Sequence, residues 1–340
     1  MPASATVHVP LQAESTARAN IALIKYWGKR GRTVDGNAGL NLPAVGSLSI
    51  TLDALFTRTR IHFNAALERD VLRLNGREDT AATARLARYL DLFRRRAGRR
   101  EFALVESDNN FPTGAGLASS ASGYAALAAA AAAALNLELP AAELSTLARQ
   151  GSGSAARSIF GGFVEWHRGG KDDGSDSYAE PLAPADHWPL RVVVAVTDEG
   201  PKATGSTDGM TRTEFTSPYF DAWVDGQEND LADARAAVLS RDFEKLADVS
   251  EYSCLKMHAS ALAARPGVIY WNGATIEALN AVRNLRAKGV AVFFTIDAGP
   301  QLKAVCLAES EPAVRETLLG INGVKRIISS GLGAGVEVRS

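Results

Sequence analysis

The feature that most constrains the fold is an alanine-rich segment, residues 125–135, which follows a loop rich in glycine and serine. Alanine has the highest helix propensity and a thin side chain, so the segment predicts a helix that neighbouring elements can approach closely. Such a helix suits a central, buried position. The loop before it, "PTGAGLASSASG" at 112–123, therefore begins beside a rigid support.

Two interpretations of this loop follow from its residues. Gly114 and Gly116 lack Cβ atoms, which leaves the backbone open to a ligand, and serine hydroxyls follow them. The N–H groups and positive dipole at the helix start would complete an anion site suited to phosphate. The alternative is a capped turn that binds nothing, and the stretch alone favours neither. It is not a Walker A loop, because the Gly-Lys-Ser/Thr ending is absent.

Composition excludes several classes of protein. The 340 residues suffice for two modest domains or one large one, and a net charge of -1 lacks the basic excess of nucleic-acid binders. The two cysteines, Cys254 and Cys306, have neither metal-ligand nor redox spacing, which is typical of a reducing cytosol. The first residues do not resemble a signal peptide, and the alanine run is too short and too weakly apolar to span a bilayer. We therefore expect a cytoplasmic protein without nucleic-acid or membrane partners.

Hydrophobic periodicity predicts an α+β protein in which helices are segregated against mixed sheets. We expect strands at 47–55, 101–108, 162–169, 190–200, 290–300, 301–307 and within 323–338, and a hairpin region formed by 58–63 and 71–76 with Asn75-Gly76 as a turn. Helices are expected at 80–98, along the alanine run, within 140–162, at 217–242, 243–264 and 273–289, and around 311–319. Residues 169–188 are polar and rich in Gly, Asp and Pro, which indicates a surface excursion, and a domain boundary is expected near 190.

The pattern Pro-x-x-x-Gly-Leu-x-Ser-Ser-Ala at 112–121 resembles the phosphate loop of the GHMP kinase superfamily, in which this loop wraps the ATP phosphates. The resemblance implies an ATP- and substrate-binding domain at 1–190, similar to the second domain of ribosomal protein S5. It also implies a ferredoxin-like domain at 191–340 that carries the catalytic aspartate. Ser120 would contact the γ-phosphate or Mg²⁺. The positions that the resemblance assigns to ATP are Gly114, Gly116, Leu117, Ala118, Ser119 and Ser120.

Further motifs resemble one family within that superfamily, the diphosphomevalonate decarboxylases. They are "ANIALIKYWGKR" at 19–30, "GSGSAARSIFGGFVEW" at 151–166 and "DAGPQ" at 297–301, and they occur in the family's order. The resemblance implies that ATP and Mg²⁺ are used to phosphorylate the 3-hydroxyl of mevalonate 5-diphosphate. Phosphate and CO₂ are then lost and isopentenyl diphosphate forms, a step of isoprenoid biosynthesis. A homodimer is implied as well.

The family motifs also assign residues to the reaction. Asp297 would lie near the 3-hydroxyl and orient it or take its proton, Arg157 would hold the substrate carboxylate, and Lys25 would lie close to Asp297. The remaining substrate-binding positions are Asn20, Tyr26, Lys29, Ser152 and Ser154, with Tyr26 and Lys29 at the diphosphate. The adenine pocket is not assigned.

Some residues depart from the family pattern. Gln301 stands where the family often has Asn, Gly205 where a Ser is common, and Ala156 where a Cys is often seen. The first two departures leave fine substrate positioning open. Whether the 169–188 excursion covers the site is also open.

Other activities remain as alternatives. A relative could decarboxylate mevalonate 5-phosphate, or act as a 3-kinase on mevalonate or its 5-phosphate without decarboxylation. Lys25, Arg157 and Asp297 together favour decarboxylation, and Tyr26 with Lys29 favours the diphosphate. A non-enzymatic sensor would be expected to have lost the phosphate loop or the aspartate.

Overall fold

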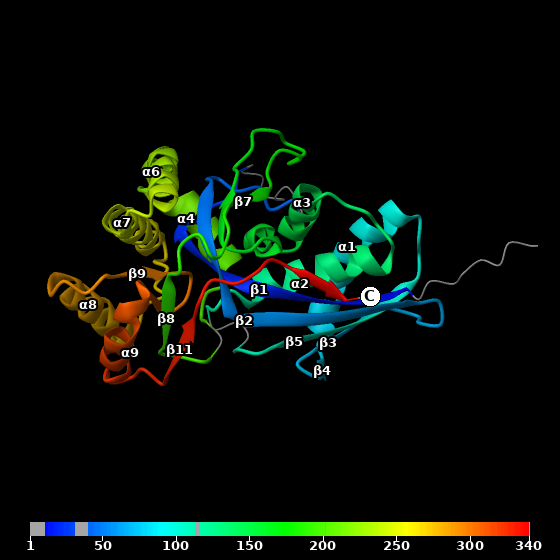
Figure 1. Ribbon diagram of the computed structural model, residues 1–340. Coiled ribbons are helices and arrows are strands. Elements are labelled where there is room, and N and C mark those ends of the chain that lie inside the picture. The colour runs from blue at the N-terminus through cyan, green and yellow to red at the C-terminus, as the bar shows by residue number, and fades with distance from the viewer. Residues whose placement is uncertain (1–10, 31–39, 113–115, 201, 340) are drawn as a thin grey trace, which may run out of the picture.

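Two β-sheets form the framework of the protein (Figure 1). The computed structural model describes residues 11–30, 40–112, 116–200 and 202–339. In the first sheet the strand order is β12-β1-β2-β5-β3-β4, and β6, paired with β7, joins β2 beside this path. Its strands are β1 (Gln12–Ile24), β2 (Ser47–Asn64), β3 (Val71–Leu74), β4 (Arg77–Glu78), β5 (Phe102–Asn109), β6 (Phe163–Trp166), β7 (Ala179–Ala183) and β12 (Glu337–Arg339). The second sheet has the order β11-β8-β10-β9, with β8 (Arg191–Val196), β9 (Val292–Ile296), β10 (Leu302–Cys306) and β11 (Arg326–Ser330).

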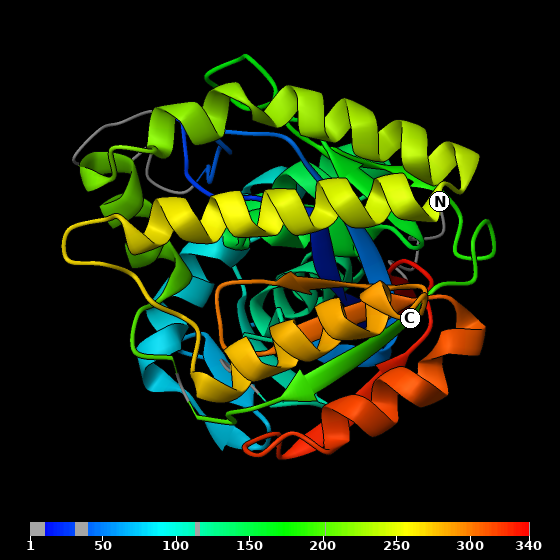
Figure 2. The ribbon, with the colours of Figure 1, turned by 90° about the vertical axis from the view of Figure 1, so that its left-hand side faces the viewer.

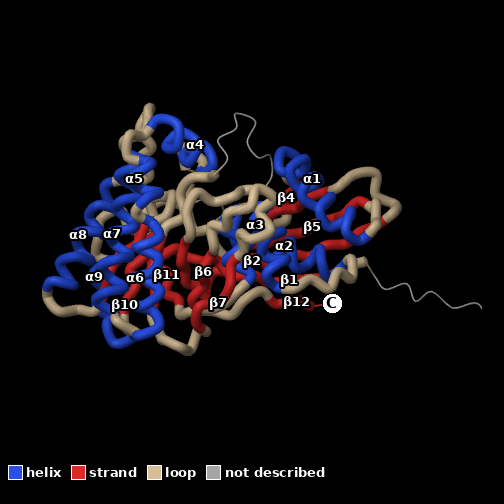
Figure 3. Tube along the Cα trace, turned by 90° about the horizontal axis from the view of Figure 1, so that it is seen from above, coloured by secondary structure: helices blue, strands red, loops and turns tan. Residues whose placement is uncertain are grey.

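The helices fall into two groups, one toward each end of the molecule (Figure 3). The first group contains α1 (Thr80–Ala97), α2 (Ser119–Ala134), α3 (Ala141–Gly151) and the 3₁₀ helix η1 (Gly153–Ile159). The second contains α4 (Ser206–Thr216), α5 (Phe220–Asp225), α6 (Gln227–Ser240), α7 (Phe243–Leu262), α8 (Gly273–Ala287), α9 (Glu311–Leu319) and the short 3₁₀ turn η2 (Ala308–Ser310). This segregation confirms the predicted α+β class. None of the described helices is long and apolar enough to cross a membrane.

The alanine helix α2 is buried, as its composition predicts. Ala125, Ala126, Ala128, Ala130 and Ala131 are fully buried, and the helix packs against β1, β2 and η1. A methyl side chain lets these backbones approach closely. The helix therefore fixes the position of its own N-terminus, which faces the candidate site.

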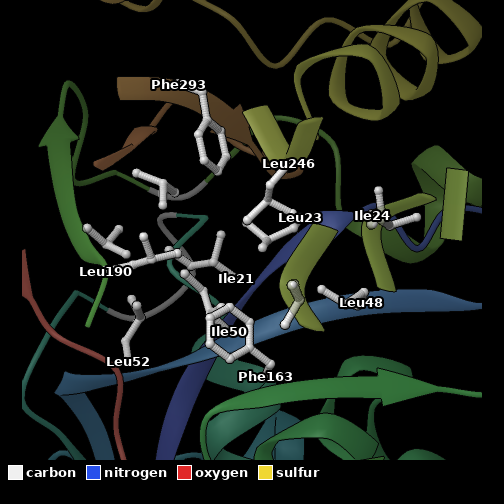
Figure 4. Close-up of a cluster of buried hydrophobic side chains, with 14 of the residues drawn as sticks. Ile21, Leu23, Ile24, Leu48, Ile50, Leu52, Phe163, Leu190, Leu246 and Phe293 are labelled. Carbon is white, nitrogen blue, oxygen red and sulfur yellow. The ribbon is translucent and has the colours of Figure 1, made fainter. Parts of the chain in front are cut away.

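The largest core cluster joins the two halves of the chain (Figure 4). Leu23 and Leu48, from the first sheet, share it with Leu190, Leu246 and Phe293. The last strand, β12, returns to the first sheet and pairs antiparallel with β1. The division into domains at residue 190 stays a prediction, because the core and β12 connect the two sides.

Two strand predictions were wrong or incomplete. Residues 58–63 do not form a hairpin with 71–76; they continue β2, in which buried and exposed residues alternate as expected for a strand with one covered face. β3 instead pairs in parallel with β5, and Asn75-Gly76 forms the turn between β3 and β4. β1 was not predicted, although it is one of the longest strands.

The 169–188 excursion is only partly a loop. Its second half contains β7, which pairs with β6 and includes Pro181. Proline is tolerated there because β7 is an edge strand that pairs with β6 alone among the described strands. Its missing N–H therefore interrupts no pairing with a second neighbour. Two helix predictions also need correction: α4 was missed, and 217–242 forms two helices, α5 and α6, separated at Gly226.

Candidate active site

A pocket of about 400 Å³ lies where elements of both sheets meet. Its walls come from the ends of β1 and β9, the start of α2, η1 and the segment that leads into α4. The structure brings together most of the residues assigned from the sequence. Those that line the pocket are Asn20, Lys25, Tyr26, Lys29, Gly116, Ala118, Ser119, Ser120, Ser152, Ser154, Arg157 and Asp297.

Asp297 lies between two lysines at the end of β9. Lys25 Nζ donates to its Oδ1 at 2.6 Å, and Lys303 Nζ donates to its Oδ2 at 3.1 Å. Both lysine side chains are 1% exposed, whereas that of Asp297 is 25% exposed. Burial alone would raise the pKa of Asp297, but the two ammonium groups outweigh it and hold that pKa well below its usual range. The site therefore contains a fixed, ionised carboxylate.

Sequence reasoning missed Lys303, which lies on β10. A signal was present, because Lys303 is the one charged residue in the strand sequence "LKAVC". A lysine in a fully buried strand needs an anionic partner, and the preceding motif contains an aspartate. The pairing itself depends on the β9–β10 register, which places Lys303 opposite Thr295.

Arg157 is held in η1 with its guanidinium buried. Its Nε donates to Asn20 Oδ1 at 3.1 Å, and its terminal nitrogen donates to Ser47 Oγ at 2.6 Å. Burial lowers its pKa to about 10, so the group remains charged near neutral pH. It forms no ion pair with any carboxylate in the described part of the chain. A buried, unpaired cation that lines a pocket favours an anionic ligand over a structural salt bridge.

A second cationic group lies in the same pocket. Lys29 Nζ donates to Asn41 Oδ1 at 2.7 Å, and burial together with the charge of Arg85 lowers its pKa. Arg85 comes from α1 and was missed, because that helix contains many arginines and its sequence does not show which one points inward. Tyr26 lies beside these cations, and a Cβ on Gly153 would lie 2.6 Å from its hydroxyl, so the glycine leaves room for the tyrosine ring.

The loop before α2 abuts the Asp-Ala-Gly-Pro turn. Gly116 has φ of +80°, and a Cβ there would lie 2.9 Å from Gly299 Cα. Its carbonyl accepts a hydrogen bond from Lys303 Nζ at 3.0 Å. Ala118, with φ of 59°, precedes the helix without a side-chain cap. This geometry favours the anion-site interpretation over a capped turn, since the described loop residues line the pocket and Ala118 has no side-chain oxygen with which to cap the helix.

The other loop residues have different surroundings. Ser120 Oγ lies 3.2 Å from Ser152 Oγ, so the two hydroxyls face the pocket together. Leu117 does not line the pocket; it is buried in the core and anchors the loop. Ser122 contacts Thr57 Oγ1 and is fully buried. Gly114 lies outside the described residues.

Lys202 is a further cation that sequence reasoning missed. Its Nζ donates to Ser206 Oγ at 2.7 Å and to Ala298 O at 2.9 Å. Burial, and then the charge of Lys303, lower its pKa to about 8. Gly205, one of the departures from the family pattern, lies beside it in the pocket wall.

Gln301, another departure from the family pattern, has a structural role. Its Oε1 accepts a hydrogen bond from Thr197 N at 2.7 Å, and its Nε2 donates to Asp198 O. The side chain is fully buried and does not line the pocket. It fixes the segment after β8, and thereby acts on the pocket only indirectly.

The side chain of Asn20 binds the backbone of Ser154. Asn20 Nδ2 donates to Ser154 O at 3.0 Å and to Ser158 Oγ at 2.7 Å. Its amide oxygen faces Arg157, so one side chain orients the guanidinium and η1 together. Ala156 is fully buried against Trp166 and lies outside the pocket wall.

Comparison with known proteins identifies close relatives. The family described as the diphosphomevalonate decarboxylase-like N-terminal domain matches residues 17–179, and the mevalonate 5-diphosphate decarboxylase C-terminal domain matches 192–334. The diphosphomevalonate decarboxylase of Candida albicans is 39% identical, over 85% of this chain and 82% of that protein. The human diphosphomevalonate decarboxylase is 39% identical, over 86% of this chain and 76% of that protein.

Solved structures agree with these matches. The mevalonate diphosphate decarboxylase of Staphylococcus aureus superposes with a TM-score of 0.90 at 38% identity, over 99% of this chain and 100% of that one. MDDEF in complex with MVAPP, AMPPCP and magnesium superposes with a TM-score of 0.88 at 40% identity, over 97% and 99%. These likenesses confirm the fold and the resemblance that the sequence motifs indicate.

Lys202 should control the binding of an anion at this site. Replacing it by Met is expected to weaken binding of AMPPCP with Mg²⁺ about tenfold near neutral pH, because a charge-assisted hydrogen bond is lost. Its ammonium is present below a pKa of about 8, so the wild-type affinity should fall as the pH rises through that value. Calorimetry across this range should show that fall in the wild type and in the exposed-lysine control Lys288→Met, but not in Lys202→Met. Equal affinities for all three proteins would contradict the assignment.

Proposed function

Because this chain belongs to the diphosphomevalonate decarboxylase family, we propose that it converts mevalonate 5-diphosphate to isopentenyl diphosphate with ATP and Mg²⁺. One observation carries the proposal for this chain's own residues. The ionised carboxylate of Asp297, held by Lys25 and Lys303, lies in the pocket that Arg157 and the loop before α2 also line. The pocket thus combines a loop suited to phosphate, a cation suited to a carboxylate and an anion that can orient a hydroxyl.

In the first step the 3-hydroxyl oxygen of the substrate attacks the γ-phosphorus of ATP, and ADP leaves with the electron pair of the broken P–O bond. Asp297 accepts a hydrogen bond from the hydroxyl and aligns it for attack. Its low pKa makes it a weak base, so Asp297 takes the hydroxyl proton only as the new P–O bond forms. Lys25 and Lys202 offset the negative charge that develops.

In the second step the C3–O bond breaks and phosphate departs with the electron pair. The C1–C2 bond then supplies the pair for the new C2=C3 double bond, and CO₂ is released from C1. Arg157 holds the C1 carboxylate, and its orientation is fixed by Asn20 and Ser47. The buried guanidinium keeps the carboxylate in place while phosphate leaves.

The diphosphate end is assigned to Tyr26, Lys29 and Arg85, with Ser152 and Ser154 along the adjacent wall. Two cations at this end suit a diphosphate better than a monophosphate, which distinguishes the proposal from a 5-phosphate decarboxylase. Magnesium neutralises charge on the ATP phosphates when bound. Ser120 is the hydroxyl that this chain would offer it, since hard cations prefer oxygen ligands.

A substrate panel tests the proposed reaction. The purified protein is incubated with ATP, Mg²⁺ and, in turn, mevalonate, its 5-phosphate and its 5-diphosphate, while ADP and CO₂ are measured together. We expect equal amounts of ADP and CO₂ with the 5-diphosphate and little of either with the others. ADP without CO₂ would indicate a 3-kinase, and preferred turnover of the 5-phosphate would indicate a monophosphate decarboxylase.

Asp297→Asn should abolish turnover while the protein stays folded. The amide keeps the shape of the side chain but loses the negative charge that aligns the hydroxyl, so kcat should fall about 10³-fold or more. AMPPCP binding, measured by calorimetry, should remain within about threefold of the wild type, since the loop and Lys202 are unchanged. CO₂ release near the wild-type rate would refute the role given to Asp297.

We also propose that the protein is a homodimer joined through α7. Tyr252, Leu255 and Leu262 are exposed by 58%, 41% and 44% and recur at helical spacing. In Figure 2, α7 (yellow) crosses the face turned to the viewer beside α6. An apolar stripe of this kind on a helix is suited to a second copy of the same helix around a two-fold axis.

The dimer is tested by sedimentation. Leu255→Lys should convert a dimer to a monomer, because a charge would be buried at the contact. The control Lys288→Met, which does not lie on this helix, should leave the mass unchanged. A wild-type monomer, or a dimer that persists in Leu255→Lys, would contradict the proposed interface.

A cytoplasmic location is proposed from the free, buried thiols of Cys254 and Cys306, which suit a reducing compartment. Fractionation of the source cells tests this, and recovery with an oxidising compartment would contradict it.

A further inference from the structure

Lys303 is the one member of the Asp297 cluster that does not line the pocket. Its ammonium is buried behind the carboxylate, with 1% of the side chain exposed. It makes two contacts of nearly equal length: 3.1 Å to Asp297 Oδ2 and 3.0 Å to the carbonyl oxygen of Gly116. One side chain therefore joins the carboxylate to the loop before α2.

These contacts fix the orientation of the carboxylate. Lys25 binds one oxygen and Lys303 the other, so the carboxylate plane cannot rotate without breaking an ion pair. A carboxylate has about four lone-pair sites, and the two lysines occupy about two of them. Because the Asp297 side chain is 25% exposed, the remaining sites stay open to the pocket.

The second contact fixes the distance between two loops. Gly116 approaches Gly299 so closely that a Cβ on Gly116 would lie 2.9 Å from Gly299 Cα. This packing holds the loops together but does not set the position of the carboxylate within them. Lys303 supplies that missing link, since it contacts the Asp297 side chain and the Gly116 backbone at once.

A lysine on β10 is costly for the fold itself. Every residue of this strand is buried, and burying an ammonium group costs about as much free energy as its ion pair returns. An apolar residue of similar length would pack in the strand without that cost. The presence of lysine therefore needs an explanation other than stability.

We infer that Lys303 is a positioning residue for phosphoryl transfer, which ties the phosphate loop to Asp297 so that the γ-phosphorus and the 3-hydroxyl meet at attacking distance. This inference rests on the proposed function. Lys303 acts through Asp297 and Gly116 and does not touch the substrate. Lys25, by contrast, lines the pocket and can contact the reacting groups directly.

Three variants test the inference. Lys303→Met and Lys303→Gln remove the charge at similar length, and Lys303→Arg keeps it. For the two neutral variants we expect kcat to fall by about 10- to 100-fold, because a small displacement of a positioned group has effects of this size. KM for mevalonate 5-diphosphate should stay within about threefold, since Arg157 and the diphosphate-binding cations are unchanged. AMPPCP should bind about three- to tenfold more weakly, because Gly116 has lost its tether.

The pH profile gives an independent readout. Removing a positive charge beside Asp297 raises the pKa of the carboxylate, so the acid limb of kcat should move to higher pH by about 1 unit or more. Lys303→Arg should keep this limb near its wild-type position and recover part of kcat. The melting temperature of Lys303→Met should not fall below that of the wild type, because an apolar replacement removes a buried charge and leaves Asp297 its pairing with Lys25.

Lys256→Met is the matched control. It breaks another partly buried ion pair, Lys256 with Asp230 at 2.6 Å, whose residues do not line the pocket. Its melting temperature should change while kcat and the acid limb stay as in the wild type. The inference is overturned if the neutral Lys303 variants keep the wild-type kcat and AMPPCP affinity, or if their activity falls only in proportion to the folded fraction.

Failure of the proposed function would look different. Wild-type protein that formed no ADP with any of the three mevalonate substrates would refute the reaction, yet the AMPPCP affinities would still decide whether Lys303 holds the loop. Wild-type protein that formed ADP without CO₂ would be a 3-kinase. The role of Lys303 would then be read from ADP formation, since it concerns phosphoryl transfer alone.

Discussion

The buried ion cluster of Asp297, Lys25 and Lys303 is the interaction on which the rest of the site depends. Lys25 follows β1 of the first sheet, whereas Asp297 follows β9 and Lys303 lies on β10 of the second. Buried charges must be paired, so the cluster fixes how the two sheets meet. A hydrogen bond between neutral groups supports the same junction: Thr295 Oγ1, from β9, donates to Ala22 O at 3.1 Å. The pocket lies at this junction, and its geometry follows from the pairing.

The pocket concentrates positive charge that the whole chain does not show. The protein has a net charge of -1, yet Lys25, Lys29, Arg85, Arg157 and Lys202 all face one cavity whose described lining residues include one carboxylate, that of Asp297. Low-dielectric walls strengthen the field of such a cluster, which attracts polyanionic substrates. The net charge predicted no nucleic-acid partner, and it could not reveal a cationic pocket of this size. Only the folded arrangement brings these groups together from distant parts of the sequence.

Residues within contiguous motifs could be predicted from the sequence, and residues that act through tertiary contacts could not. Lys25, Arg157 and Asp297 could be assigned from the sequence because each lies in a motif whose neighbours identify it, and all three line the pocket. Arg85 is one arginine among many in α1, and Lys303 acquires its role only from the β9–β10 register. The strand errors have a similar origin. The continuity of β2 past residue 58 depends on its pairing with β1 and β5, which local periodicity does not encode.

The small residues near the site are a geometric requirement of the reaction proposed here. The loop before α2 must reach Asp297, yet α2 packs on the first sheet and Asp297 follows β9 of the second. The alanines of α2 let β1 and β2 pack close to the helix, which brings its N-terminus toward the end of β1. Gly116 and Gly299 then remove the last side chains from between the loop and the Asp-Ala-Gly-Pro turn. A larger residue at Gly116 would have to push the backbone of Gly299 away, and the link through Lys303 would stretch with it. The alanines of α2 and the glycine of the loop before it therefore serve one purpose. They let that loop come close to a carboxylate held by the other sheet.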